Sequence, residues 1–526
     1  MAMYINPGNE GFRTCRRSEY VDKSGMIRVV NQTIGTVKKL SLISRPRRFG
    51  KSTAAKMLCA YYDKTCDSGK LFDDLEIAAD ETYKEHLNKY NVIYLDITNI
   101  LSEAEDRGNI VPFIRKGIKE ELRDFYPDAV WEDSLSKALL QTVETTGNKF
   151  IAIIDEWDVL FRDGHTTEKV QWEYLEFLRS LFKSSGTTDK IFAAAYMTGI
   201  LPVKKDGSQS AISEFREYTM FRPGKFAPYI GFTGDEVKAL CKKHDMDFSQ
   251  MKFWYDGYSF KEIDSIYNSN SVMEAICNKT YESYWAMSSA TDSLLSYINM
   301  DFDGLGEAAE ELLAGISIDV NYRKFQNDLV SFRSKDDVLT LLVHFGYLSY
   351  DSEEGTVHIP NEEIRVEFAD MIRDVTHTET IHRIKESDKL LLDTVDKNEE
   401  AVAAQIEKVH TEEYAPRHYN SEQALRSVIK LAYFVYKDHF VQLEELPSGT
   451  GIADIVYLPK KRSDFPILLI ELKWNQDAEG AISQIKDRNY PKALEGYGSE
   501  ILLVGISYDK DDKEKKHTCK IEEWTL

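Results

Sequence analysis

The sequence has few cysteines, and their spacing excludes several kinds of site. The 526-residue chain contains 6 cysteines, scattered from Cys15 to Cys519. No two of them have the C-x-x-C spacing that structural zinc sites and thiol oxidoreductases use. They also lack the density of the disulfide frameworks that stabilise small secreted domains. We therefore expect reduced and mostly buried thiols.

Long apolar runs are also absent. No window approaches the roughly 18 to 20 consecutive apolar residues of a membrane-spanning helix. The N-terminal stretch MAMYINPGNEGFRTCRRSEY lacks the apolar core of a signal peptide. A hydrophobic content of 42% is ample for packed cores, and a chain of this length predicts about two to four domains. We expect a cytoplasmic protein that does not associate with membranes.

Positive charge is in deficit over the whole chain but in excess in one segment. The 66 Lys and Arg residues face 88 Asp and Glu residues, a net charge of −22. This balance argues against a protein whose whole surface binds nucleic acid. Between Asp22 and Asp63, however, no acidic residue occurs. The segment therefore indicates an anion site. Its basic residues are Lys23, Arg28, Lys38, Lys39, Arg45, Arg47, Arg48, Lys51 and Lys56.

A phosphate-binding loop lies within this acid-free segment. The stretch SLISRPRRFGKSTAAKML follows the pattern G-x-x-x-x-G-K-[ST], except that Arg45 stands where the pattern has its first glycine. An apolar strand precedes the loop and a helical pattern follows it, so backbone N–H groups at the helix start would face the phosphates. Lys51 is expected to reach the β- and γ-phosphates, and the Ser52 hydroxyl is expected to bind Mg²⁺. Gly50 allows the backbone to approach closely.

A second apolar strand ends in acidic residues. In KFIAIIDEWD the strand is followed by Asp155 and Glu156. Asp155 would hold Mg²⁺ through water, and Glu156 would polarise the water that attacks the nucleotide. Further apolar runs, NVIYLDIT and KIFAAAYMTG, alternate with helical stretches. This alternation predicts a parallel sheet with helices on both faces.

Short motifs along the first two thirds of the chain occur in a characteristic order. They are YVDKSGMI, LISRPRRFGKST, IIDEWD, YMTGI, GFTGDEV, WYDGYSF, IYNSNSV and FGYLSYD…IPNEEIR. This series, over roughly residues 5 to 370, resembles the AAA-ATPase-like family of prokaryotic proteins, whose loop reads R-P-R-R-F-G-K-S. The resemblance implies that Arg45 is the family's own variation. It also implies that Thr198 senses the γ-phosphate, and that Asp22 and Lys23 lie either near the nucleotide or at a helix start. The residues expected to bind ATP are Arg48, Phe49, Gly50, Lys51, Ser52, Thr53, Asp155 and Thr198.

Other residues of this region leave alternatives open. Arg216 and Arg222 follow the Thr198 strand, where an arginine finger can lie, in its own or a neighbouring subunit. A homo-oligomer is therefore one of the open alternatives. One group of aromatic residues suits either a nucleic-acid stacking platform or a core. These residues are Trp254, Tyr255, Tyr258 and Tyr267.

From about Phe226 the pattern becomes mostly helical. Within it, a helix that ends at Gly346, the strands YLSYD and TVHIP, and a further helix are typical of a winged-helix module. The sequence thus predicts an α/β multidomain protein. We expect an AAA-like P-loop ATPase domain over residues 1–225, a helical lid and winged-helix-like region over 226–375, and a third domain over 376–526.

Charged residues end two strands of the predicted third domain. GIADIVYL and FPILLIELKW predict an antiparallel hairpin. Glu471 and Lys473 share one face of its second strand, and strand pairing can bring Asp454 alongside. Alternating charge is also common on exposed strands, but PILLIE is too apolar to be exposed. Two carboxylates and a lysine suit a Mg²⁺ or Mn²⁺ site that activates water against a phosphodiester.

The order of elements around this hairpin carries a second resemblance. A helix with Glu422, a strand with Asp454, a strand with E-x-K and a helix with Gln484 resemble the PD-(D/E)XK nuclease superfamily. The resemblance implies a C-terminal α/β restriction-endonuclease-like domain. In it, Asp454 and Glu471 are metal ligands and Lys473 serves the water or the phosphate. Glu422 is then an auxiliary acid, and Gln484 supports the site.

Together these features predict an ATP-binding and hydrolysing protein whose nucleotide state controls a Mg²⁺-dependent nuclease acting on DNA or RNA. The alternative is a nucleotide-switched regulatory or scaffold protein whose C-terminal domain binds nucleic acid or protein without cutting. A complete set of Asp454, Glu471 and Lys473 favours the nuclease. The net charge of −22 favours the alternative.

Overall fold

The computed structural model of the 526-residue chain divides into two compact units. The first comprises Met1–Gly304 and Asp319–Phe368, and the second comprises Leu305–Ile318 and Ala369–Leu526. Within the residues described, no helix is both long enough and apolar enough to cross a membrane. The structure describes residues 3–104, 106–127, 134–163, 165–183, 186–203, 205–206, 209–210, 212, 214–261, 263–285, 302–325, 332–372, 378–413, 425, 428–429, 432–433, 440–448, 451–459, 465–474, 477–488, 490–494, 500–508 and 516–525.

A 5-stranded sheet with the order β2-β3-β4-β1-β7 organises the first unit. Every neighbouring pair is parallel, so the carboxyl ends of the strands meet at one edge. Strands β1, β3 and β4 are buried along their whole length, as expected for a sheet covered on both faces. The predicted parallel sheet is confirmed. Its strands are β1 (Leu40–Ser44), β2 (Asn91–Asp96), β3 (Phe150–Asp155), β4 (Phe192–Gly199) and β7 (Arg216–Tyr218).

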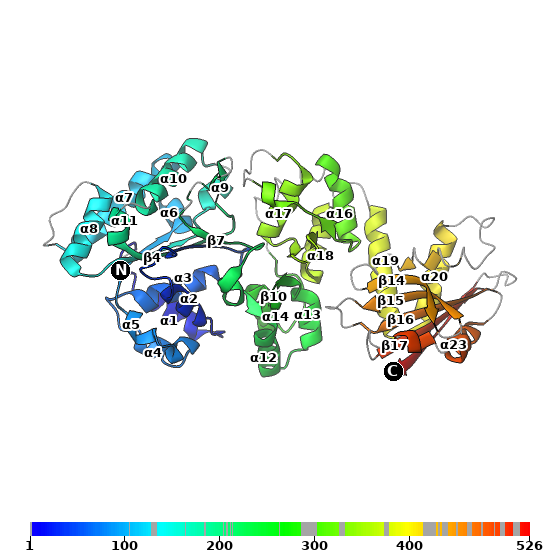
Figure 1. The fold of residues 1–526 in the computed structure, drawn as a ribbon. Helices are drawn as coiled ribbons and strands as arrows, with labels where there is room; N and C mark the ends of the chain where they lie inside the picture. The colour runs from blue at the N-terminus through cyan, green and yellow to red at the C-terminus, as the bar shows by residue number, and fades with distance from the viewer. Residues whose placement is uncertain are drawn as a thin grey trace. The chain divides into compact units, whose positions relative to one another are not determined.

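Helices cover the two faces of this sheet. Helix α3 (Lys51–Tyr62) lies on one face, and α6 (Ile97–Glu103), α7 (Ile110–Phe125) and α10 (Glu168–Phe182) lie on the other (Figure 1). Apolar residues recur at every fourth position of α7, which gives the helix one apolar stripe. This stripe joins the core of the sheet. Its residues are Ile110, Ile114, Ile118 and Leu122.

The first unit also contains further helices. They are α1 (Glu10–Arg17), α2 (Gly25–Asn31), α4 (Gly69–Phe72), α5 (Tyr83–His86), α8 (Leu135–Thr146), α9 (Val159–Arg162), α11 (Gly186–Ile191), α12 (Gly234–His244), α13 (Phe248–Tyr255), α14 (Ser269–Asn278) and α17 (Lys335–Phe345). Helix α18 (Glu362–Ile372) begins in this unit.

The region after Phe226 contains more strand than predicted. A 3-stranded antiparallel sheet has the order β8-β10-β9. The helical prediction missed it because aromatic residues hide the strand alternation of this segment. Tyr255, Tyr258 and Tyr267 are fully buried, so they belong to a core and not to a stacking platform. The strands are β8 (Phe232–Thr233), β9 (Tyr258–Phe260) and β10 (Ile263–Tyr267).

The predicted helix, hairpin and helix are confirmed further along. Helix α17 ends at Gly346, whose φ of 89° is left-handed, a conformation that favours glycine. Strand β12 (Ser349–Asp351) then pairs antiparallel with β13 (Thr356–His358), and α18 follows. The winged-helix likeness and the three predicted domain boundaries stay predictions.

A 5-stranded mixed sheet with the order β14-β15-β16-β17-β18 forms the second unit. Strands β16 and β17 are parallel, and the other neighbours are antiparallel. Helix α23 (Ala478–Asp487) lies in the crossover between β16 and β17. The strands are β14 (Phe440–Ser448), β15 (Gly451–Pro459), β16 (Ile467–Trp474), β17 (Glu500–Tyr508) and β18 (His517–Thr525).

Alternating side chains give this sheet a separate core on each face. Ile455 and Tyr457 pack with residues of α19 (Thr378–Val395) and α20 (Glu399–Glu413). Val456 packs with residues of α23. Because side chains alternate along a strand, Asp454 shares the α23 face with Val456. Glu471 and Lys473 share it in the same way with Leu469, which belongs to the same core. The second unit also includes α16 (Leu305–Leu313).

A close approach of two backbones in the first unit requires glycine. Gly257 has φ of 105°, and a Cβ added there would lie 1.7 Å from the carbonyl oxygen of Pro360, just before α18. We expect Gly257→Ala to destabilise the protein by about 3 kcal/mol, through overpacking added to backbone strain. Gly355→Ala is the control, since its φ is 78° but nothing lies within 4 Å. It should cost only about 1 kcal/mol. Equal losses in denaturant unfolding would contradict this account.

Candidate functional site

The phosphate-binding loop joins the end of β1 to the start of α3. Gly50 precedes the helix with φ of 87°, and Arg48 also has a positive φ of 66°. Among the described residues, no side chain caps the start of α3. Ser52 and Thr53 are half-buried in its first turn. The first N–H groups of the helix therefore have no side-chain acceptor and can bind an anion.

Arg45, which replaces the first glycine of the pattern, is part of the protein interior. Its side chain is fully buried, and Nη1 donates to the carbonyl oxygens of Ser44 (2.8 Å) and Tyr218 (3.3 Å). The guanidinium lies over the Phe260 ring, 5.1 Å from its centroid. Burial lowers the pKa of Arg45 to about 10. Arg45 thus joins β1 to β7 and to β9, and its side chain is enclosed by protein.

The next residues of the loop are also bound by later parts of the chain. Arg48 Nη1 donates to the carbonyl oxygen of Tyr284 at 2.8 Å. The buried Phe49 ring packs edge-on against Tyr258, with centroids 5.2 Å apart, and its carbonyl oxygen accepts from Gly231 N at 2.9 Å. Phe49 can therefore contribute only its backbone to ATP binding, whereas the exposed Arg48 side chain has a hydrogen bond to protein at Nη1.

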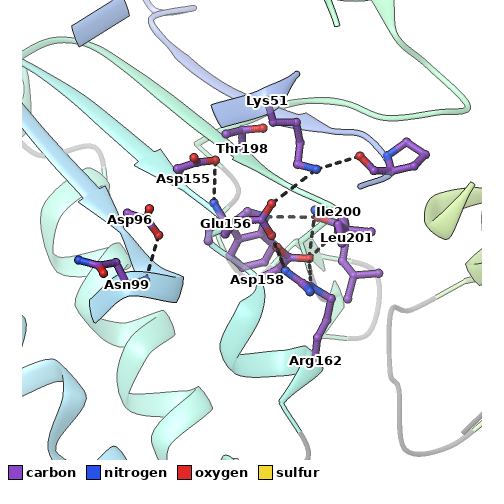
Figure 2. A network of polar contacts seen from close by, with 12 residues as sticks. Lys51, Asp96, Asn99, Asp155, Glu156, Asp158, Arg162, Thr198, Ile200 and Leu201 are labelled. Atoms are coloured by element: carbon purple, nitrogen blue, oxygen red, sulfur yellow. Dashed lines mark hydrogen bonds and ion pairs between the residues drawn. The ribbon is translucent and has the colours of Figure 1, made fainter. Parts of the chain in front are cut away.

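The acidic end of β3 lies beside the start of α3 (Figure 2). Asp155 is buried and accepts a hydrogen bond from the Ser52 hydroxyl. Burial is the main reason that the pKa of Asp155 is raised to about 6. Lys51 Nζ donates to the carbonyl oxygen of Pro46 at 2.9 Å and lies 3.6 Å from Glu156 Oε1. The structure thus brings the predicted lysine, hydroxyl and two carboxylates together.

Two further features of this edge bear on a bound nucleotide. The Thr198 hydroxyl, at the end of β4, donates to the carbonyl oxygen of Ile43 in β1 at 3.1 Å. The Ser52 hydroxyl and the Asp155 carboxylate offer the oxygen ligands that Mg²⁺ prefers. A cation would also offset the cost of burying Asp155 in its charged form. These residues therefore fit Mg²⁺.

Two charged residues at this edge were missed by sequence reasoning. Arg162 Nε donates to Asp158 Oδ2 at 2.9 Å, and Arg162 Nη2 donates to Glu156 Oε2 at 2.5 Å. Asp158 Oδ2 also accepts from the backbone N–H groups of Ile200 (3.1 Å) and Leu201 (2.8 Å). The spacing was the available signal, because Asp158 precedes the short helix α9 and Arg162, four residues later, ends it.

Other predicted residues of the first unit lie in different surroundings. Lys23 Nζ binds the Glu236 carboxylate at 2.6 Å. Asp22 Oδ1 accepts from Ser24 N at 2.8 Å, next to the start of α2. These contacts support the helix-start alternative over a place beside the nucleotide. Arg222 lies over the ring of a tyrosine, 6.0 Å from its centroid, and the identity of an arginine finger stays undecided.

The predicted metal centre of the second unit lies between β15, β16 and α23. Asp454 is 7% exposed and Glu471 is 2% exposed. Asp454 Oδ2 accepts from Leu472 N at 2.9 Å. Glu471 Oε1 accepts from Gln484 Nε2 and from Lys473 Nζ, the latter at 3.5 Å. Lys473 Nζ also donates to Gln484 Oε1 at 2.6 Å. Hydrogen bonds thus join Glu471, Lys473 and Gln484 in one polar cluster. Asp454 lies on the neighbouring strand, close enough for its charge to act on Glu471.

Glu471 is incompletely satisfied within this cluster. Burial, followed by the charge of Asp454, raises the pKa of Glu471 to about 7. Among the described residues, its buried Oε2 atom has no hydrogen-bond partner. Such an oxygen is costly to bury, and a divalent cation held by two carboxylates would offset that cost. Asp454 and Glu471 therefore fit Mg²⁺ or Mn²⁺.

In the described part of the chain, the candidate metal site has two carboxylates, Asp454 and Glu471. There, no group of three or more His, Cys, Asp or Glu residues is placed to hold a metal ion. Glu422, the predicted auxiliary acid, lies outside the described residues. Its place relative to Asp454 and Glu471 stays a prediction.

Comparisons with known proteins bear mainly on the first unit. Residues 8–208 match the model of a family described as "Predicted AAA-ATPase". A relative from Azotobacter chroococcum mcd 1, described as an uncharacterized protein in the vnfD 5′ region, is 19% identical over 511 residues. That alignment covers 94% of this chain and 93% of the relative.

Two solved structures from Aeropyrum pernix show weak similarity. The ORC2 protein, in ADPNP-ADP complexes, is 12% identical and aligns with 71% of this chain and 98% of its own, with a TM-score of 0.32. The ORC1 protein in complex with DNA is 9% identical, with coverages of 70% and 97% and a TM-score of 0.25. TM-scores this low are too weak to establish a shared fold. The family match and the chain's own sheet together support an ATPase-like P-loop region in the first unit.

Proposed function

We propose that the chain binds and hydrolyses ATP, and that its nucleotide state controls a Mg²⁺-dependent nuclease in the second unit. The ATPase half is supported by the meeting of Lys51 and Ser52, at the start of α3, with Asp155 and Glu156, at the end of β3. The nuclease half is carried by one observation, the buried and unpartnered Oε2 of Glu471 within the cluster described above.

The residues around α3 have distinct roles in this proposal. The N–H groups of the first turn and the ammonium of Lys51 bind the phosphates. Ser52 and Asp155 would hold Mg²⁺, which supplies charge neutralisation when bound. Once the phosphates engage Lys51, Glu156 Oε1 loses its partner at 3.6 Å and can accept a hydrogen bond from water. The Thr198 hydroxyl lies on the neighbouring strand, where it can turn toward the γ-phosphate.

The second unit has the groups that phosphodiester hydrolysis needs. Asp454 and Glu471 would hold Mg²⁺ or Mn²⁺, which when bound neutralises charge on the phosphate and lowers the pKa of water. Lys473, oriented by Gln484 at 2.6 Å, donates to the attacking water or to a phosphate oxygen. DNA and RNA are both substrates of suitable chemistry.

Control by nucleotide requires a link from the loop to other parts of the chain. Arg48 donates to the carbonyl oxygen of Tyr284, and Tyr284 N donates to Glu363 Oε1 at 2.8 Å. Glu363 lies in the first turn of α18. The chain of α18 continues into the sequence of the second unit. A change in the loop can therefore be transmitted to α18.

The alternative is a nucleotide-switched scaffold whose second unit binds nucleic acid or protein without cutting. The net charge of −22 and the presence of only two acidic ligands in the described cluster favour it. In either case we propose a cytoplasmic location, where ATP is available and the free cysteines stay reduced.

Removal of Lys51 tests the nucleotide site. We expect Lys51→Ala to weaken ATP binding about 100-fold and to abolish hydrolysis, because the charge facing the phosphates is lost. Glu156→Gln should bind ATP normally and hydrolyse it about 100-fold more slowly. Lys56→Ala, an exposed lysine of the same helix, is the control. Calorimetry measures ATP binding, and phosphate release measures hydrolysis. If Lys51→Ala hydrolyses ATP at the wild-type rate, the proposed nucleotide site is wrong.

Three substitutions test the metal centre with plasmid DNA and short RNA, with Mg²⁺ or Mn²⁺ and with or without ATP. Asp454→Ala and Glu471→Ala should lose metal affinity and cleavage together. Lys473→Ala should lose cleavage but keep the metal, because an ammonium is not a ligand. The control is Glu500→Ala, an exposed carboxylate of β17.

Two outcomes would contradict the nuclease proposal. Cleavage by all three variants at the wild-type rate would mean that the activity lies elsewhere. Metal-independent binding of DNA by a wild type that never cuts would favour the scaffold.

The link through Glu363 predicts a pH dependence of stability. Burial raises the pKa of Glu363 from 4.5 to about 7, so the folded state binds this proton more tightly than the unfolded state does. Stability from this group is therefore lost as the pH rises toward and through the folded value. From about pH 6 to about pH 8, wild type should lose about 1 kcal/mol more than Glu363→Gln. The control is Glu354→Gln, which removes an exposed carboxylate of the hairpin and should behave as wild type in thermal unfolding. If the stability of wild type and of Glu363→Gln changes with pH in the same way, the prediction is wrong.

A further inference from the structure

We infer that Arg162 is a positioning residue of ATP hydrolysis, which holds one oxygen of Glu156 and leaves the other to act on water. The inference rests on the proposed ATPase function. It assigns a role to an ion pair that no motif of the sequence singled out.

The two oxygens of Glu156 have different partners (Figure 2). Oε2 accepts from Arg162 Nη2 at 2.5 Å, whereas Oε1 lies 3.6 Å from Lys51 Nζ. Lys51 is the group that the phosphates engage in the proposed reaction. Binding of ATP would therefore free Oε1 alone, while Oε2 stays on the guanidinium. The carboxylate then keeps a fixed orientation with one oxygen available for water.

Arg162 is itself held in place by Asp158. Arg162 is 5% exposed and Asp158 is fully buried, and their side chains are joined at 2.9 Å. The pair is four residues apart across α9, so the helix sets its geometry. Arg162 cannot turn away from Glu156 without leaving Asp158. Asp158 thus holds Arg162, and Arg162 orients the reacting carboxylate of Glu156, as in other sites where a third residue orients the partner of a reacting group.

Asp158 is in turn built into the end of β4. Its Oδ2 atom accepts from the N–H groups of Ile200 and Leu201. A Cβ added to Gly199 would lie 2.4 Å from Asp158 Oδ1, so this close packing needs a glycine. Glu156 has a positive φ of 50°, a strained conformation that surrounding contacts must hold. The ion pair between Arg162 and Glu156 is thus anchored, through Asp158, to the backbone that directly follows β4.

The test measures ATP turnover and ATP binding by the full chain. We expect Arg162→Ala to lower kcat about 10- to 100-fold, while the Kd for ATP changes less than about twofold, because the carboxylate is misplaced but the phosphate contacts remain. Arg162→Lys, which keeps the charge but cannot bridge both carboxylates, should lose kcat by a smaller factor. If Arg162→Ala fails to fold because Asp158 is left unpaired, the kcat of Arg162→Lys still tests the role of Arg162.

Chemical rescue distinguishes positioning from a merely structural role. Guanidinium ion at low millimolar concentration should restore part of the kcat of Arg162→Ala, but none in the double variant Arg162→Ala/Glu156→Gln. Arg107→Ala is the matched control, because its 2.6 Å ion pair with Asp163 lies in the same region and is exposed. It should turn over ATP as wild type does.

Three results would overturn the role of Arg162. They are a wild-type kcat in Arg162→Lys and Arg162→Ala, a rise in Kd with kcat unchanged, or rescue that does not need Glu156. A failed ATPase proposal is distinguished by the wild type, which would then show no turnover, or by Lys51→Ala turning over ATP as wild type does.

Discussion

The first unit depends on the neutralisation of charge at the carboxyl edge of its parallel sheet. Asp155 and Asp158 are buried there, and Glu156 lies between them. Buried carboxylates without partners cost several kcal/mol each. Lys51 from α3 and Arg162 from α9 provide the compensating charges. Cations from two different helices thus offset the cost of bringing these carboxylates together at the edge of the sheet.

The second unit also buries carboxylates, but its positive charges neutralise them less completely. Asp454 and Glu471 are both buried, and Lys473 is the cation bound within their cluster. One carboxylate oxygen has no partner in the described residues. In the first unit Glu156 and Asp158 form ion pairs with Lys51 and Arg162, and the charge of Lys51 also acts on Asp155. When both carboxyl groups of the second unit are ionised, they outnumber Lys473 by one charge, which is a setting that favours a divalent cation.

Two arginines of the phosphate-binding loop, Arg45 and Arg48, contact residues of the fold itself. Arg45 is buried between strands and an aromatic ring, and Arg48 is bound to the carbonyl oxygen of Tyr284. Both contacts reach residues far along the chain. The loop therefore keeps its shape only when the later parts of the first unit are folded around it.

Local patterns in the sequence determined four of the five strands of the first sheet (β1, β2, β3 and β4), the loop, helix α3 and the acids at the end of β3, but not the short edge strand β7. Apolar period, glycine placement and the G-K-S triplet are local properties of neighbouring residues. The approach of Asp454, Glu471, Lys473 and Gln484 was also predictable, since strand alternation and a following helix suffice to place them on one face.

Only the tertiary structure decided which distant residues join these elements. It inserted β4 between β1 and β3, buried Arg45, and formed the small sheet of β8, β9 and β10 that a mostly helical pattern had hidden. It also turned Arg162 onto Glu156. Strand order and ion-pair partners depend on which surfaces pack across long separations in the chain. Periodicity within a short window carries no information about those contacts.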